Sequence, residues 1–220
     1  MATTGVINGS YGHTSILFGL TRVFLFQQSI ARPLQDILRT PDSERYALLR
    51  TYNDSFPHND PDTKHQKQAA SAINQEINRE FKKMSFENVG MLLQTIRKHV
   101  ASGSEFLEYL PKKDIIETVY KMLVQYQAKP EQYPGNIQLF HDELWQLLES
   151  IYPEASDDEK FFICSFFQES ALYYGFSSTL SLPSQTSCLE LLSFFLYSHQ
   201  QVKEKFAADE SFVYVNQSFR

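Results

Sequence analysis

The densest run of large apolar side chains lies at residues 157–176, which read DDEKFFICSFFQESALYYGF. As a helix with about 3.6 residues per turn, this segment is apolar over more than half of its circumference, whereas a surface helix needs roughly a third. Ser156 and Glu159 match a capping box at its start, and Gly175 supplies a break at its end. We therefore expect a helix over 157–175 that is covered on several sides and forms the centre of an all-α domain.

The rest of the chain also carries apolar residues at helical spacing, separated by short breaks rich in Gly, Pro, Asn and Ser. Short loops favour antiparallel neighbours, and no motif recurs at a fixed period as it does in helical-repeat families. The predicted fold is all-α, either an irregular multi-helix bundle or a short helical-repeat-like array of eight or nine helices. Besides 157–175, the predicted helices cover about 15–39 with a kink at Pro33, 41–52, 60–84, 85–102, 106–110, 112–127, 136–151 and 184–207.

The two ends of the chain differ from its middle in composition. Glycines and small polar residues fill the first fourteen positions, and a β-favouring run, Phe212–Val215, lies in the last twelve. The segment from Lys129 to Gly135 is the strongest break between them. The predicted organisation is a flexible N-terminal arm, a single all-α domain that can be divided into two subdomains, and a C-terminal tail: 1–14, 15–208 (subdomains 15–128 and 136–208) and 209–220.

Charge and targeting signals restrict the classes of partner. The net charge is −6, and the Lys and Arg residues form no long basic run, so we expect no nucleic-acid binding. The apolar stretch at 16–26 is interrupted by Arg22 and is too short for a membrane span or a signal peptide. Cys164 and Cys188 lie in apolar runs, as small reduced core residues of an intracellular protein do. We predict a cytoplasmic protein without a membrane span.

No pattern of residues predicts catalysis, a cofactor or a metal. The chain has no phosphate-binding loop, no dinucleotide-binding glycine turn and no nucleophile elbow. Cys188 and His199 on one helix would lie about 16 Å apart, too far for a catalytic pair. No two histidines have metal-binding spacing. We therefore predict a protein that is not an enzyme; the alternative is a helical enzyme or carrier with an apolar pocket for a lipid or small molecule, near Cys164, His141 or His199.

Several aromatic and apolar residues fall where a simple helix pattern would place polar ones. Such misplaced rings either pack against other parts of the domain or form a partner-binding surface, because exposed aromatic clusters are what such surfaces use. We predict a non-enzymatic protein–protein interaction module that binds or regulates a partner protein through the C-terminal helices. The residues proposed for this exposed aromatic and polar surface are Phe161, Gln168, Glu169, Leu172, Phe194 and Tyr197.

The composition is also informative. Its richness in Gln, Asn and Phe, together with the polar C-terminal tail that holds Glu204 and Glu210, resembles that of bacterial effectors delivered into host cells by a secretion system. The resemblance is compositional and covers no motif. It implies that the partner is a host protein or another effector, and that the tail serves as an export signal.

Overall fold

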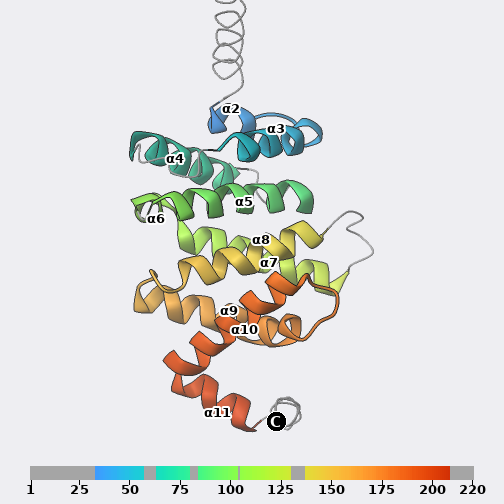
Figure 1. The fold of residues 1–220 in the computed structure, drawn as a ribbon, viewed down its shortest axis with the longest axis vertical. Helices are drawn as coiled ribbons and strands as arrows, with labels where there is room; N and C mark the ends of the chain where they lie inside the picture. Colours follow the sequence, from blue (N-terminus) through green and yellow to red (C-terminus); the bar gives the residue numbers. More distant parts are fainter. Residues whose placement is uncertain (1–32, 57–62, 80–83, 104, 130–136, 209–220) are drawn as a thin grey trace, which may run out of the picture. The chain divides into compact units, whose positions relative to one another are not determined.

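A computed structural model describes residues 33–56, 63–79, 84–103, 105–129 and 137–208 (Figure 1). The chain divides into two compact units, Met1–Pro33 and Leu34–Arg220, and every helix described here belongs to the second. The predicted arm at 1–14, the part of the helix predicted over 15–39 that precedes Pro33, and the tail at 209–220 lie outside the described residues. The described stretches contain helices and no strand, which confirms the all-α fold class.

Ten helices are present in these stretches, where the sequence predicts eight or nine in the whole chain. One correction explains part of the difference. The helix predicted over 184–207 is two helices, because the chain breaks at His199, whose φ of −127° and ψ of 105° are those of an extended residue. The helices are α2 (Leu34–Leu38), α3 (Asp42–Ser55), α4 (Thr63–Arg79), α5 (Phe86–Ser102), α6 (Glu105–Tyr109), α7 (Lys112–Ala128), α8 (Gln138–Ile151), α9 (Asp157–Gly175), α10 (Leu182–Ser198) and α11 (Gln200–Ala208).

Serine side chains start three of the helices. Ser156 and Glu159 form the capping box predicted for α9, with the Glu159 carboxylate accepting from the Ser156 backbone N–H at 2.9 Å. Ser85 accepts from the backbone of α5, and Ser181 from that of α10. Each cap satisfies a backbone N–H that a helix start otherwise leaves without a partner. The local sequence therefore fixes where these helices begin.

The helices of the second unit pack mainly on neighbours that are close along the chain (Figure 1). α2 contacts α3 and α4, α3 contacts α5, and α4 contacts α6. The most extensive contact joins α5 to α8, and it crosses the predicted boundary between residues 128 and 136. From α8 the packing continues to α10, which also contacts α9 and α11, while α7 packs on α9.

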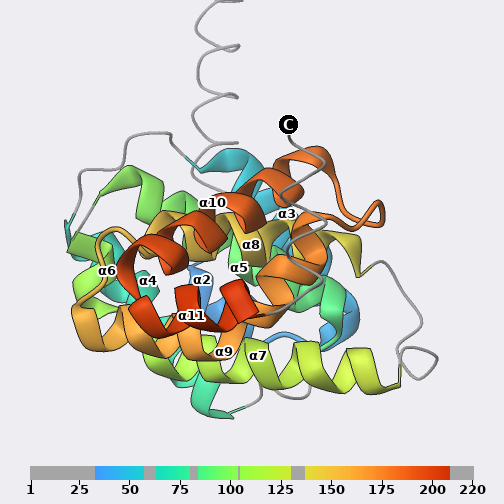
Figure 2. The ribbon, with the colours of Figure 1, turned by 90° about the horizontal axis from the view of Figure 1, so that it is seen from below.

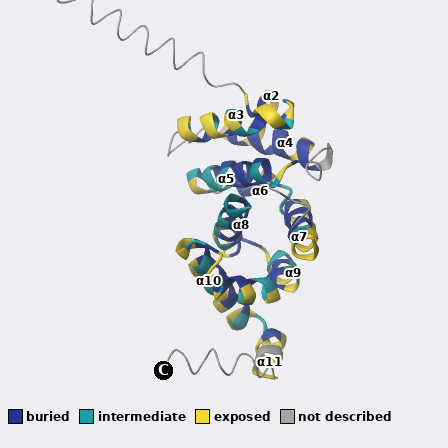
Figure 3. Cartoon of the chain, turned by 90° about the vertical axis from the view of Figure 1, so that its right-hand side faces the viewer, coloured by how far each residue is buried: buried dark blue, intermediate teal, exposed yellow. Residues whose placement is uncertain are grey.

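The helix at 157–175 is not the centre of the bundle, contrary to the sequence-based expectation. α9 packs on α10 and α7, and Ile163, Phe167 and Ala171 form its buried face. Its opposite face meets solvent, where Phe161 is 59% and Tyr173 is 66% exposed. The central position belongs to α5, which has helices on both sides and is buried over most of its length (Figure 3).

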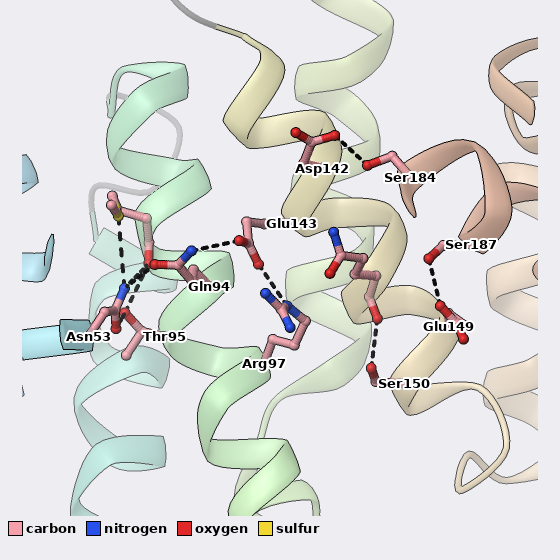
Figure 4. Close-up of polar contacts among 12 residues, drawn as sticks. Asn53, Gln94, Thr95, Arg97, Asp142, Glu143, Glu149, Ser150, Ser184 and Ser187 are labelled. Carbon is pink, nitrogen blue, oxygen red and sulfur yellow. Dashed lines mark hydrogen bonds and ion pairs between the residues drawn. The ribbon is translucent and has the colours of Figure 1, made fainter. Parts of the chain in front are cut away.

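Polar side chains join three helices through the middle of the unit (Figure 4). Buried Asn53 of α3 bonds to Thr95 at 2.8 Å and to Gln94 at 3.1 Å, both on α5. Gln94 and Arg97 of α5 then donate to the buried Glu143 of α8, each at 2.7 Å. We call these five residues the polar seam. Because buried polar groups require specific partners, the seam fixes the register of α3, α5 and α8.

A second set of polar contacts holds the start of α10 on α8 (Figure 4). The Asp142 carboxylate accepts hydrogen bonds from the hydroxyls of Ser181, at 2.6 Å, and Ser184. One turn further along α10 and two turns further along α8, Ser187 donates to Glu149 at 2.6 Å. These hydrogen bonds thus anchor the N-terminal half of α10 on α8.

Candidate functional site

A groove opens where α10 ends and α11 begins, alongside the first half of α9. Its volume is about 460 Å³. Figure 2 views the unit from the end at which α9, α10 and α11 lie nearest to the viewer. We call this feature the C-terminal groove, and its lining residues are Phe161, Cys164, Ser165, Gln168, Ser198, His199, Gln200, Gln201 and Val202.

The groove exists because the helix breaks at His199. The backbone N–H of His199 still bonds to the Phe195 carbonyl at 3.0 Å, so α10 closes normally. Its imidazole Nε2 and the hydroxyl of Tyr152 form a hydrogen bond of 3.3 Å. Tyr152 is a buried residue that follows α8. A tertiary contact therefore holds His199 at the point where the chain changes direction.

Aromatic rings surround this break on both sides. The Phe161 ring of α9 meets the His199 ring edge-on, with centroids 6.0 Å apart. On the other side, Phe194 stacks on Tyr152 at 5.6 Å with an angle of 15° between the planes. Such ring pairs add about 0.5–1.5 kcal/mol beyond the area they bury. Of the two pairs, only Phe161 and His199 line the groove, and they form its aromatic edge.

The groove itself combines apolar and uncharged polar side chains. Phe161, Cys164 and Val202 provide apolar contact, and the remaining lining residues carry hydroxyl, amide or imidazole groups. Asp, Glu, Lys and Arg are absent from the lining formed by the described residues. Among the described residues, the side-chain amides of Gln168 and Gln201 make no hydrogen bond. An amide offers both a donor and an acceptor, so these groups suit a ligand with peptide-like polarity.

Cysteine catalysis does not fit this arrangement. Cys164 and His199 line the same groove, as a catalytic pair would. However, Cys164 is buried, and burial raises the pKa of its thiol to about 11. Burial also raises the pKa of the Cys188 thiol. Because the thiolate is the reactive form, a thiol that stays protonated at neutral pH is a poor nucleophile.

The structure brings together only some of the residues predicted to bind a partner. Phe161 and Gln168 line the C-terminal groove. Tyr197, 87% exposed, lies one residue before the lining residue Ser198, and Phe194 covers Tyr152. Glu169 is exposed on α9 outside the lining. Leu172 is partly buried and packs against the core. A role for these six residues in partner binding stays a prediction.

Among residues 198–202, the sequence pointed only to His199 as a possible pocket residue, and the other four were not predicted to line a groove. They were assigned to the interior of one continuous helix, whose apolar stripe ran on to Val202. A signal was present, because Ser198, His199, Gln200 and Gln201 form a polar run inside that stripe. A run of four polar residues spans a full helical turn and interrupts the buried face.

His141, the other histidine proposed to lie near a pocket, belongs to the core. His141 on α8 is 4% exposed, and its ring lies 4.6 Å from that of Tyr174. Burial lowers the pKa of His141 to about 4. His99 on α5 is also buried, stacked on Phe106 at 4.8 Å. No group of three metal-ligating side chains occurs in the described stretches, and none of their helices is long and apolar enough to cross a membrane.

No protein-family model, no curated protein and no solved structure matches the chain. The function must therefore be inferred from the groove and its surroundings.

Proposed function

We propose that the protein is a non-enzymatic interaction module that binds an extended segment of a partner protein in the C-terminal groove. One observation supports this most strongly: an exposed aromatic edge lies beside uncharged hydrogen-bonding side chains. Partner-binding sites use aromatic anchors for most of their affinity. In an extended peptide, backbone N–H and C=O groups need partners, and the amides of Gln168 and Gln201 offer both kinds.

The partner segment would be apolar or aromatic and low in charge. The lining has no ionic group to pair with a charged side chain, and an unpaired charge is costly to remove from water. One ring of such a segment would lie against Phe161. The compositional resemblance to bacterial effectors supports a host protein, or another effector, as the source of this segment.

Selection of short displayed peptides on the purified protein tests this proposal. We expect enriched peptides to share one or two aromatic or large aliphatic residues. Their affinity should fall at least tenfold, or about 1.4 kcal/mol, on the variant Phe161→Ser. The matched control is Tyr173→Ser, on the same helix and similarly exposed but outside the groove. Equal losses on both variants, or no enrichment at all, would contradict the proposal.

The volume of the groove also favours a second candidate, a carrier of a small apolar molecule. Ligand pockets commonly have volumes of about 300–1,000 Å³, and about 460 Å³ lies within that range. Native mass spectrometry of the purified protein separates the two functions. A lipid or metabolite that is retained by the native chain, and lost in the variant Phe161→Ser, would support the carrier and argue against the peptide site.

A further inference from the structure

The last described helix leads directly away from the C-terminal groove. Gln200, Gln201 and Val202 line the groove, and α11 ends at Ala208. Residues 209–220 follow in the sequence. Residues 209–220 are therefore tethered to one wall of the groove through α11.

The composition of that segment matches the groove. Residues 211–219 contain no charged side chain, and the lining formed by the described residues contains none. Within the segment, Phe212, Val213, Tyr214 and Val215 are consecutive large apolar or aromatic residues. In an extended chain, alternate side chains point to the same face. Phe212 and Tyr214 can therefore contact one surface together.

The length of the connection allows the segment to return to the groove. From Val202 to Ala208, six residues of helix cover about 9 Å at 1.5 Å per residue. From Ala208 to Phe212, four extended residues reach up to about 13 Å. The tether is thus long enough for Phe212 to come back alongside Val202, and a short tether gives a bound segment a high effective concentration.

We propose that residues 212–215 of the same chain occupy the C-terminal groove and compete there with the partner segment. This rests on the proposed function, because it takes the groove to be a peptide site. Phe212 and Tyr214 supply the rings that lie against the aromatic edge, and the amides of Gln168 and Gln201 bond to the backbone of the segment. A partner segment then binds only by displacing residues 212–215.

Chemical labelling of the full chain tests this proposal. A reporter thiol is introduced by Gln200→Cys, at an exposed position of the lining, and its alkylation by iodoacetamide is followed by peptide mapping. The double substitution Phe212→Ser with Tyr214→Ser should speed alkylation about tenfold, if the segment fills the groove nine-tenths of the time. The native Cys164 and Cys188 are buried and react slowly.

Two further variants make the measurement specific. Ser165→Cys, also at an exposed position of the lining, places the reporter on the α9 wall and should respond in the same way. Tyr173→Cys, exposed on α9 but outside the groove, should be alkylated at the same rate with or without the double substitution. An unchanged rate at both groove reporters would overturn the proposal, as would protection that weakens on dilution, because a second copy would then supply the segment.

Peptide selection distinguishes failure of this inference from failure of the proposed function. If the groove binds peptides but not its own tail, selected peptides will bind the native chain and the tail variant equally, and the reporters will be unprotected in both. If the tail fills the groove but no foreign peptide binds, the reporters will respond while the selection yields nothing. With both correct, selected peptides bind the tail variant about tenfold more tightly.

Discussion

The buried His141 should make the stability of the protein depend on pH. Its ring lies among Tyr126, Phe140 and Tyr174, and burial lowers its pKa from 6.5 to about 4. The folded state therefore holds His141 neutral, while the unfolded chain takes up a proton below pH 6.5. A histidine with a lowered pKa contributes its full stability above the unfolded value and loses it as the pH falls toward the folded value.

The size of the loss follows from the two pKa values. Each pH unit within the window corresponds to about 1.4 kcal/mol. Between pH 7.5 and pH 5.0 the native protein should therefore lose about 2 kcal/mol of unfolding free energy through His141, and below pH 4 the total should reach about 3 kcal/mol. The nearby Asp142 opposes the shift, but more weakly than burial produces it.

Urea unfolding at pH 7.5 and pH 5.0 measures this effect, with His141→Leu as the comparison. Leu has similar volume and does not titrate. Between pH 7.5 and pH 5.0, the native protein should therefore lose about 2 kcal/mol more unfolding free energy than the variant does. A proton NMR titration of the His141 ring should show the lowered pKa directly. Equal pH dependence of the native protein and the variant, with equal denaturant slopes, would refute the reasoning.

Two further predictions concern the contact between α5 and α8. Glu143→Leu removes the acceptor shared by Gln94 and Arg97, and the unfolding free energy should fall by about 1–2 kcal/mol, since two hydrogen bonds are lost while both partly exposed donors can still reach water. Unchanged urea unfolding would show that the polar seam contributes little. Gly90→Ala would bring a Cβ within 2.9 Å of the Phe140 backbone nitrogen, and calorimetry should show a loss of about 2 kcal/mol. In the control Gly103→Ala, the new Cβ meets only the end of the flexible Gln66 side chain, at 2.8 Å, so a loss as large as that of Gly90→Ala would contradict the explanation.

Local signals in the sequence predict much of this fold. The capping box at Ser156 and Glu159 and the cap at Ser85 start helices where expected, because a cap depends only on residues within one turn. The buried position of His99 also had a local signal, as it follows Ile96 by three residues and lies on the same face of α5.

The site could not be predicted in the same way, because it depends on contacts between distant residues. The break at His199 involves a hydrogen bond to Tyr152, 47 positions earlier. The spacing of apolar residues alone predicts one continuous helix across His199. The exposure of Tyr173 likewise depends on which neighbours α9 receives. Periodicity shows that a helix has an apolar face, but it does not show how much of that face other helices will cover.

The order of packing along the chain has a consequence for the motions of the groove. α11 forms one wall and is attached to the bundle through α10, whereas the polar seam ties α3, α5 and α8 together far from it. Opening free energies within one protein range from near zero at chain ends to the global value in the core. α11 can therefore detach and re-form while α5 and α8 stay folded. Amide hydrogen exchange in α11 should be fast, and a bound segment should slow it without altering exchange in α5.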